Sequence, residues 1–247
     1  MASGLAEDVF DLVVPIITWN MDNPQDNPEM AIDAGKYRGK VISVNSELEW
    51  HVGRALEDRG TSPDHYRYFI VPGTPHIPDP LCDGTLGNMT TPAGWQPALR
   101  AHFLQGHEWV TQGVAPPAST HLATTGGVIA RDTKRNALLV DITGASAPRL
   151  PFVEIGEATF IVPRGLTGLD RLLGTYAPQP PPTIEDLGFP SFPEYLAAFE
   201  KALNAQKQAG YMLEEDADDL LNRAKLSPPE TFTENYFRHY GDFRSCM

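Results

Sequence analysis

The sequence is short of cysteine, of basic residues and of long apolar runs. Its 247 residues include only Cys82 and Cys246, which are too few for a disulfide framework or a structural zinc site. Lys and Arg total 19 against 32 Asp and Glu, and the net charge of −13 excludes a general nucleic-acid binder. No stretch approaches the roughly 18–20 apolar residues of a membrane span, and the first fifteen residues hold no Lys or Arg of a secretory signal. We therefore expect a cytoplasmic protein with no nucleic-acid or membrane partner.

Glycine and proline, in contrast, are plentiful. The 21 glycines and 23 prolines predict many turns and long ordered loops rather than a helical bundle. Residues 1–35 read as an irregular lead-in, in which the apolar run Val9 to Ile17 suits either a strand or a buried helical turn. Asn20 to Pro28 is crowded with Asn, Asp and Pro, so we expect a loop there.

The clearest pattern lies in residues 39–71. Gly39 to Asn45 is a β-branched run typical of a buried strand, and Tyr66 to Val71 is a second apolar strand. Between them, Ser46-Glu47-Leu48-Glu49 matches a capping box, and apolar residues keep helical spacing to about Asp58. A strand, a helix and a strand in this order predict a βαβ unit with parallel strands, and hence an α/β fold.

A long loop follows the second strand. Residues 76–97 hold several Gly and Pro residues, and a loop of that length at the carboxyl end of a parallel strand is usually functional. Trp95 to Gly113 then predicts an amphipathic helix, with Leu99, Phe103 and Val110 among its apolar positions.

The second half of the chain divides into a turn-rich part and a helical part. Residues 125–163 are strand-like, with the expected strands at Gly126 to Ala130, Leu138 to Ile142 and Phe160 to Val162. The prolines of Pro178 to Pro182 mark a boundary. Residues 190–225 are the longest helical region, in which Tyr195, Phe199 and Leu203 share one face.

The residues that best suit catalysis follow the two predicted parallel strands. Glu47 and Glu49 come directly after the first strand, and His76 comes shortly after the second. Parallel strands place these residues at the same edge of a sheet, with neighbouring strands about 4.8 Å apart. A carboxylate that holds a histidine by one ring nitrogen fixes its tautomer and stabilises its charged form, as an acid–base pair requires.

Each member of this set also has a structural interpretation. Acidic side chains in a first helical turn are favoured by the helix dipole, and Glu49 fits the capping box directly. This slightly favours Glu47 as the acid, with Glu49 kept as the alternative. His76 lies in the special sequence Gly73-Thr74-Pro75-His76 rather than on an apolar face, so a purely structural role suits it less well.

Other groups of polar residues point less clearly to a site. His76, Asp79 and Cys82 lie three residues apart in one proline-flanked loop, with no second cluster to complete a metal site. His102 and His107 are five residues apart and lack the Glu of a zincin helix. The five carboxylates of Glu214 to Asp219 suit a solvated helix start. No Gly-rich phosphate loop stands between a strand and a helix, so we expect no cofactor and no metal.

Several segments resemble a known family. Val71-Pro72-Gly73-Thr74-Pro75-His76 resembles the "AGTxH" segment that carries the histidine in α/β hydrolase domain-containing proteins. Further similar segments follow in the family's order, and these are Pro97-Ala98-Leu99-Arg100, Trp109-Val110, Gly113-Val114-Ala115-Pro116-Pro117, Arg135-Asn136-Ala137, Arg149-Leu150-Pro151 and Gly210-Tyr211-Met212-Leu213-Glu214-Glu215-Asp216-Ala217. The resemblance covers about residues 36–225. It implies an esterase-like acyl hydrolase with a small-molecule ester substrate, in which His76 is the general base and Glu47 or Glu49 orients it.

The resemblance covers the C-terminal half of the family domain. Such hydrolases carry the catalytic serine in a G-x-S-x-G elbow that precedes the acid and the histidine, and this sequence contains no such elbow. Gly144-Ala145-Ser146-Ala147-Pro148 lacks the second Gly and follows the histidine. Ser46 stands between a strand and a helix, but the bulky Val44 and Leu48 flank it, so we interpret Ser46 as an N-cap.

Without a nucleophile, the chain alone is expected to show little or no activity. Three explanations stay open: an incomplete hydrolase, a hydrolase complemented by a partner chain, or a non-catalytic ligand-binding or assembly module. An exposed sheet edge would serve a complementing chain or self-association. The expected organisation is an irregular lead-in (1–35), a partial hydrolase-like parallel sheet (36–124), a turn-rich β insertion (125–178) and a helical C-terminal region (179–247).

Overall fold

The computed structural model describes residues 10–18, 27–52, 56–77, 93–163, 165, 171–177 and 183–226. Its largest sheet has three parallel strands in the order β1 (Leu12–Val13), β2 (Lys40–Ser46) and β3 (Tyr66–Val71). Helix α2 (Glu47–Val52) follows β2 directly, so the predicted parallel βαβ unit is confirmed. The helix ends earlier than the predicted Asp58, because residues 56 and 57 already form a turn and a bend.

Where the structure describes it, the segment expected to be an irregular lead-in contains two regular elements. Part of the apolar run Val9 to Ile17 forms β1, and Ile16 makes an isolated bridge to Val44. Helix α1 (Pro28–Asp33) begins where only a loop was predicted. Asn27 caps this helix, because its side-chain oxygen accepts a hydrogen bond from the Glu29 N–H at 2.8 Å, and proline is favoured in the first turn.

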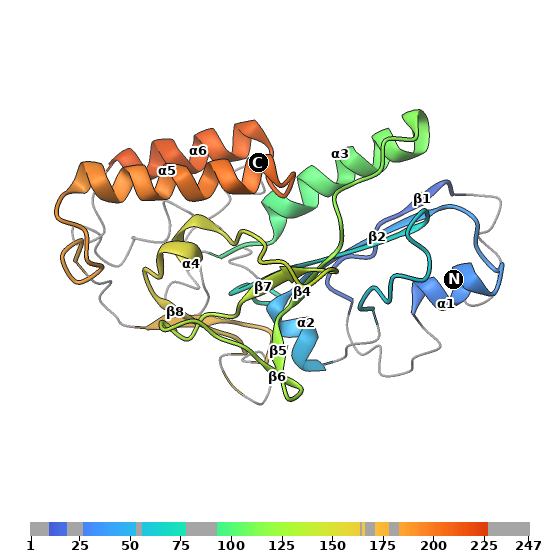
Figure 1. Cartoon of the computed structure of the whole chain (residues 1–247), viewed down its shortest axis with the longest axis horizontal. Helices are drawn as coiled ribbons and strands as arrows, with labels where there is room; N and C mark the ends of the chain where they lie inside the picture. Colours follow the sequence, from blue (N-terminus) through green and yellow to red (C-terminus); the bar gives the residue numbers. More distant parts are fainter. Residues whose placement is uncertain are drawn as a thin grey trace.

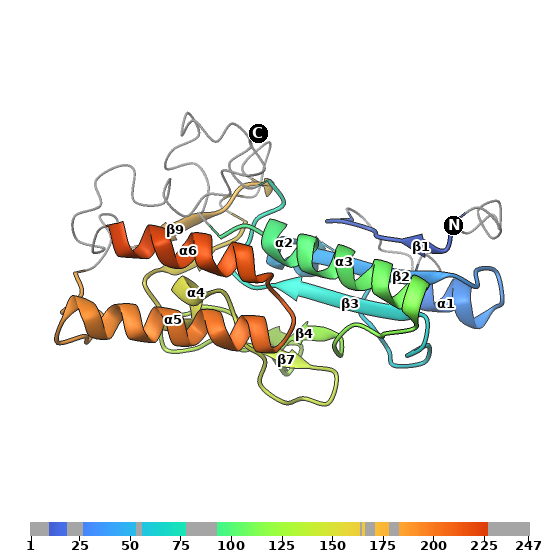
Figure 2. The ribbon, with the colours of Figure 1, turned by 90° about the horizontal axis from the view of Figure 1, so that it is seen from above.

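Helix α3 (Gln96–Gln112) packs on the sheet, mainly against β2, and its axis runs along the strands (Figure 2). Its predicted limits are confirmed, since Gly113 ends it in the left-handed conformation with φ 74°. The predicted apolar face is partly wrong, because Phe103 is 56% exposed. The buried residues of the helix include the small Ala98, Ala101 and Gly106 beside His102 and Trp109. A Cβ on Gly106 would lie 2.8 Å from the Leu12 side chain, so close packing leaves no room for a larger residue at this position.

The described residues between 120 and 177 include three short antiparallel strand pairs, and the strands predicted at residues 126–130, 138–142 and 160–162 are confirmed. The pairs are β4 (Thr120–Leu122) with β7 (Leu139–Asp141), β5 (Thr124–Thr125) with β6 (Val128–Ile129), and β8 (Thr159–Ile161) with β9 (Thr175–Ala177). Helix α4 (Pro151–Ile155) precedes β8. At the outer edge of β3, the N–H groups of Tyr68 and Ile70 donate to the hydroxyls of Ser119 and Thr120 at 3.0 and 3.3 Å. These side chains occupy main-chain donors of β3 that a further strand would otherwise use.

The helical region predicted at residues 190–225 is confirmed as two helices. Helices α5 (Phe192–Gln208) and α6 (Glu214–Leu226) lie side by side in both views (Figures 1 and 2). Tyr195, Phe199 and Leu203 are buried and join the larger of two hydrophobic clusters, which also contains Ile42 and Val44 of the sheet. The proposed boundary at Pro178 to Pro182 lies outside the described residues. The described part of the chain contains no helix with the length and apolar character that a membrane span needs.

Candidate functional site

The capping box predicted at Ser46 is formed, and it orders Glu49. The Ser46 hydroxyl accepts a hydrogen bond from the Leu48 N–H at 3.3 Å. In return, Glu49 Oε2 accepts the Ser46 N–H at 2.8 Å and also the Ser46 hydroxyl. Both side chains are buried. The start of α2 therefore fixes one oxygen of the Glu49 carboxylate and leaves the second oxygen for another partner.

That second partner is His76. His76 Nδ1 lies 2.6 Å from Glu49 Oε1, and the His76 side chain is 19% exposed whereas that of Glu49 is 3% exposed. The contact follows from the topology, because Ser46 and Val71 are register partners at the carboxyl ends of β2 and β3. Since an ionised carboxylate can only accept, Nδ1 is the donor, and Nε2 is the basic nitrogen of that tautomer.

Glu47, which the sequence slightly favoured as the acid, has other partners. Its Oε2 accepts the Gly73 N–H at 2.7 Å, and its Oε1 forms an ion pair with Arg131 Nη2 at 2.9 Å. The preference for Glu47 as the carboxylate that orients His76 therefore does not match the structure. The reason is that a carboxylate has two oxygens, so Glu49 serves the capping box and the histidine together.

Burial dominates the electrostatics of Glu47. The side chain is fully buried, and loss of hydration raises the pKa of its carboxyl above the usual value. The Arg131 charge and the Gly73 N–H oppose this shift, but they do not cancel it. Sequence reasoning missed Arg131, which lies 84 residues from Glu47 in the turn-rich region and matches no local motif.

The remaining candidates from the sequence do not form a site among the described residues. Asp79 and Cys82 lie outside the described part of the chain, which contains no group of three or more His, Cys, Asp or Glu side chains that could hold a metal. In the acidic start of α6, Asp216 is buried and receives two hydrogen bonds from Arg100, at 3.1 and 2.7 Å. Ser146 is exposed and makes an isolated antiparallel bridge to Val140.

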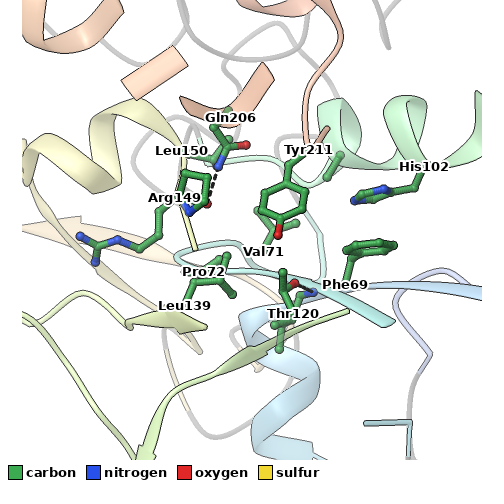
Figure 3. Close-up of a pocket in the computed structure, with 13 residues that line it drawn as sticks. Phe69, Val71, Pro72, His102, Thr120, Leu139, Arg149, Leu150, Gln206 and Tyr211 are labelled. Carbon is green, nitrogen blue, oxygen red and sulfur yellow. Dashed lines mark hydrogen bonds between the residues drawn. The ribbon is translucent and has the colours of Figure 1, made fainter. Parts of the chain in front are cut away.

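A small cavity lies between the end of β3 and the turn that joins α5 to α6 (Figure 3). His102 lies against it, stacked on Phe69 with ring centroids 3.5 Å apart. Burial lowers the pKa of His102 to about 4, although its hydrogen bond to Gln105 opposes this shift. The cavity has a volume of about 20 Å³, which is enough for one water molecule and too small for a substrate.

A comparison with known protein families shows which family the chain belongs to. A model of the alpha/beta hydrolase domain family matches residues 5–222, which is most of the sequence and includes much of the expected lead-in. The chain therefore belongs to the alpha/beta hydrolase domain family. No curated protein and no solved structure shows significant similarity to it.

Proposed function

We propose that this member of the alpha/beta hydrolase domain family supplies the acid and the base of a carboxylic-ester hydrolase. His76 is the general base and Glu49 orients it, whereas the nucleophilic serine comes from polypeptide other than these 247 residues. The observation that carries this proposal is the 2.6 Å contact between His76 Nδ1 and Glu49 Oε1.

In the proposed reaction, His76 Nε2 takes the proton of a serine hydroxyl while the serine oxygen bonds to the ester carbonyl carbon. The imidazolium then gives that proton to the alcohol oxygen as the carbon–oxygen bond of the ester breaks. Water attacks the acyl-serine in a second round, and the same nitrogen accepts and returns the proton. Glu49 stabilises the imidazolium in both rounds and holds the ring in the productive tautomer.

The nucleophile is assigned to other polypeptide for two reasons. The chain contains no G-x-S-x-G elbow. The serine beside the pair, Ser46, uses its hydroxyl to cap α2 and to bind Glu49, so it is committed to these structural contacts.

A non-catalytic binding or assembly module is the second candidate, and the missing elbow favours it. A non-catalytic module predicts a filled cleft or a His76 side chain turned into the core. The partial exposure of His76 and its carboxylate partner support the acid–base role instead.

The purified chain allows a direct test with p-nitrophenyl acetate. This activated ester reacts with an imidazole base without a serine, so a slow release of p-nitrophenol is expected. His76→Ala should lower the rate about 10-fold or more, because it removes the base. Glu49→Gln should lower the rate several-fold, because it removes the carboxylate that orients the base. A fluorophosphonate probe, which labels activated serines, should not react with the chain.

His107→Ala is the matched control, because His107 is an exposed histidine on α3. It should leave the rate unchanged. A rate that survives His76→Ala would contradict the assignment of the base. Fluorophosphonate labelling together with turnover would show that a serine of this chain is the nucleophile, and the external serine would then be rejected.

A further inference from the structure

The turn that presents His76 begins at Gly73, and Glu47 binds that residue. Gly73 is the second residue after β3 and has φ 77°, a conformation that strains any residue with a side chain. A Cβ at this position would lie 3.2 Å from Phe160 and from Val153. The Glu47 carboxylate accepts the Gly73 N–H at 2.7 Å. Steric contact and this buried hydrogen bond therefore both fix the start of the turn.

The rest of the turn is held at both ends. The Thr74 hydroxyl donates to the Val71 carbonyl at 2.6 Å, which ties the turn back to β3. After the histidine, the Ile77 N–H donates to the Leu172 carbonyl at 2.9 Å. Displacement of Gly73 would therefore have to be absorbed within the three residues that include His76.

Arg131 supplies a positive charge that partly offsets the cost of burying the Glu47 carboxylate. Its Nη2 lies 2.9 Å from Glu47 Oε1, and its Nη1 donates to the Arg135 carbonyl at 3.1 Å. Asp132 orders the same turn by accepting the N–H groups of Lys134 and Asn136, both at 2.9 Å. The turn at residues 131–136 thus presents Arg131 in a defined position beside the buried carboxylate.

From these contacts we propose that Glu47 is a positioning residue for His76, acting through the Gly73 N–H with Arg131 as its counter-charge. The role rests on the proposed function of the His76–Glu49 pair. Glu47 neither touches the imidazole nor transfers a proton. It fixes the turn so that His76 Nδ1 stays within hydrogen-bond distance of Glu49.

A matched pair of double variants separates this role from simple structural support. Glu47→Gln with Arg131→Met keeps an oxygen that accepts the Gly73 N–H and removes both charges. Glu47→Leu with Arg131→Met has the same charge and a similar volume but no acceptor. The two variants therefore differ in the hydrogen bond to Gly73, while neither leaves a charged partner unpaired at this position.

The readout is the imidazole nitrogen NMR spectrum of His76 together with the p-nitrophenyl acetate rate. We expect the Gln/Met variant to keep the Nδ1–H tautomer and most of the rate. The Leu/Met variant should exchange the Nδ1 proton with solvent about 10-fold faster and lose several-fold in rate. Equal spectra and equal rates for the two variants would overturn the proposal.

Glu29→Leu controls for loss of stability, because Glu29 is a buried carboxylate that binds main-chain N–H groups before β3 rather than after it. It should lower the melting temperature without changing the His76 spectrum. Glu49→Gln separates the two proposals. If Glu49→Gln changes the His76 spectrum and rate while the Leu/Met variant does not, the positioning role fails alone. If Glu49→Gln changes neither, the proposed function fails and this inference falls with it.

Discussion

The two ends of strand β3 are built with the same device. Before the strand, Glu29 from the first turn of α1 accepts the N–H groups of Arg59, Thr61 and Ser62 at 2.5, 3.0 and 3.2 Å. After the strand, Glu47 from the first turn of α2 accepts the Gly73 N–H. Both carboxylates are fully buried, and burial is the largest cause that raises the pKa of each.

The two ends differ in what else reaches the carboxylate. Glu29 binds three main-chain donors of one loop, and the nearby Asp58 charge raises its pKa further. Glu47 binds one main-chain donor and a guanidinium that comes from 84 residues away in the sequence. A buried acid beside a loop is therefore not by itself a catalytic acid. What distinguishes the carboxyl end is that Glu49, two residues from Glu47, contacts a histidine.

The largest loss of stability is expected for a substitution at the amino end of β3. Glu29→Ala leaves three main-chain N–H groups without their acceptor, of which that of Ser62 is buried and those of Arg59 and Thr61 are partly buried. The change should destabilise the protein by about 3 kcal/mol, since each unmet donor costs about 1 kcal/mol or more. Urea unfolding measures the change. Glu108→Ala, at an exposed position of α3, is the control and should stay within about 0.5 kcal/mol. An equally small loss for Glu29→Ala would contradict the description of this end.

Another buried carboxyl, that of Glu157, makes the stability of the protein depend on pH. Glu157 accepts a hydrogen bond from the Tyr195 hydroxyl at 2.6 Å, and burial raises its pKa from 4.5 to about 8. A raised pKa means that the folded protein binds this proton more tightly, so its stabilising effect is lost as pH rises from 4.5 through 8.

Glu157→Gln removes that titration. Across pH 5 to 8 the wild type should lose about 2 kcal/mol more stability than the variant, well within the limit of about 1.4 kcal/mol per pH unit. Urea unfolding at several pH values measures the two slopes. Parallel slopes would show that the carboxyl of Glu157 does not titrate in this window.

The smallest expected difference is in the stability lost when the glycine of each loop is replaced by alanine. Gly60 and Gly73 have φ 73° and 77°, so an alanine is strained at either position by roughly 1 kcal/mol. A Cβ at Gly60 would meet Ile142 at 3.4 Å, whereas one at Gly73 would meet Phe160 and Val153 at 3.2 Å. Gly73→Ala should therefore cost about 1 kcal/mol more than Gly60→Ala, because small overpacking costs of that order. Thermal unfolding of both variants checks the difference, and equal losses would contradict it.

Local sequence patterns predicted much of this fold. The parallel pairing of β2 and β3, the limits of α3 and the C-terminal helices all follow from periodicity and capping residues. Helix α1 was missed although its signal was present, since Asn27, Pro28 and Glu29 form a typical helix start. The misjudged face of α3 depended on how closely the helix approaches the sheet, which spacing alone does not encode.

The site was predictable only in part, because its contacts join distant segments. Topology placed His76 at the same sheet edge as two glutamates, but the identity of its partner depends on side-chain geometry within one helical turn. The Arg131–Glu47 pair depends on how the turn-rich region folds back over the sheet, and no motif at either residue indicates it.

The imidazole nitrogen NMR spectrum of His76, recorded for the wild type and for Glu49→Gln, tests the His76–Glu49 pair most directly. Wild-type His76 should carry its proton on Nδ1, with slow solvent exchange, and Glu49→Gln should lose this tautomer preference. A wild-type His76 that carries its proton on Nε2, or a spectrum that Glu49→Gln leaves unchanged, would contradict the assignment of the pair.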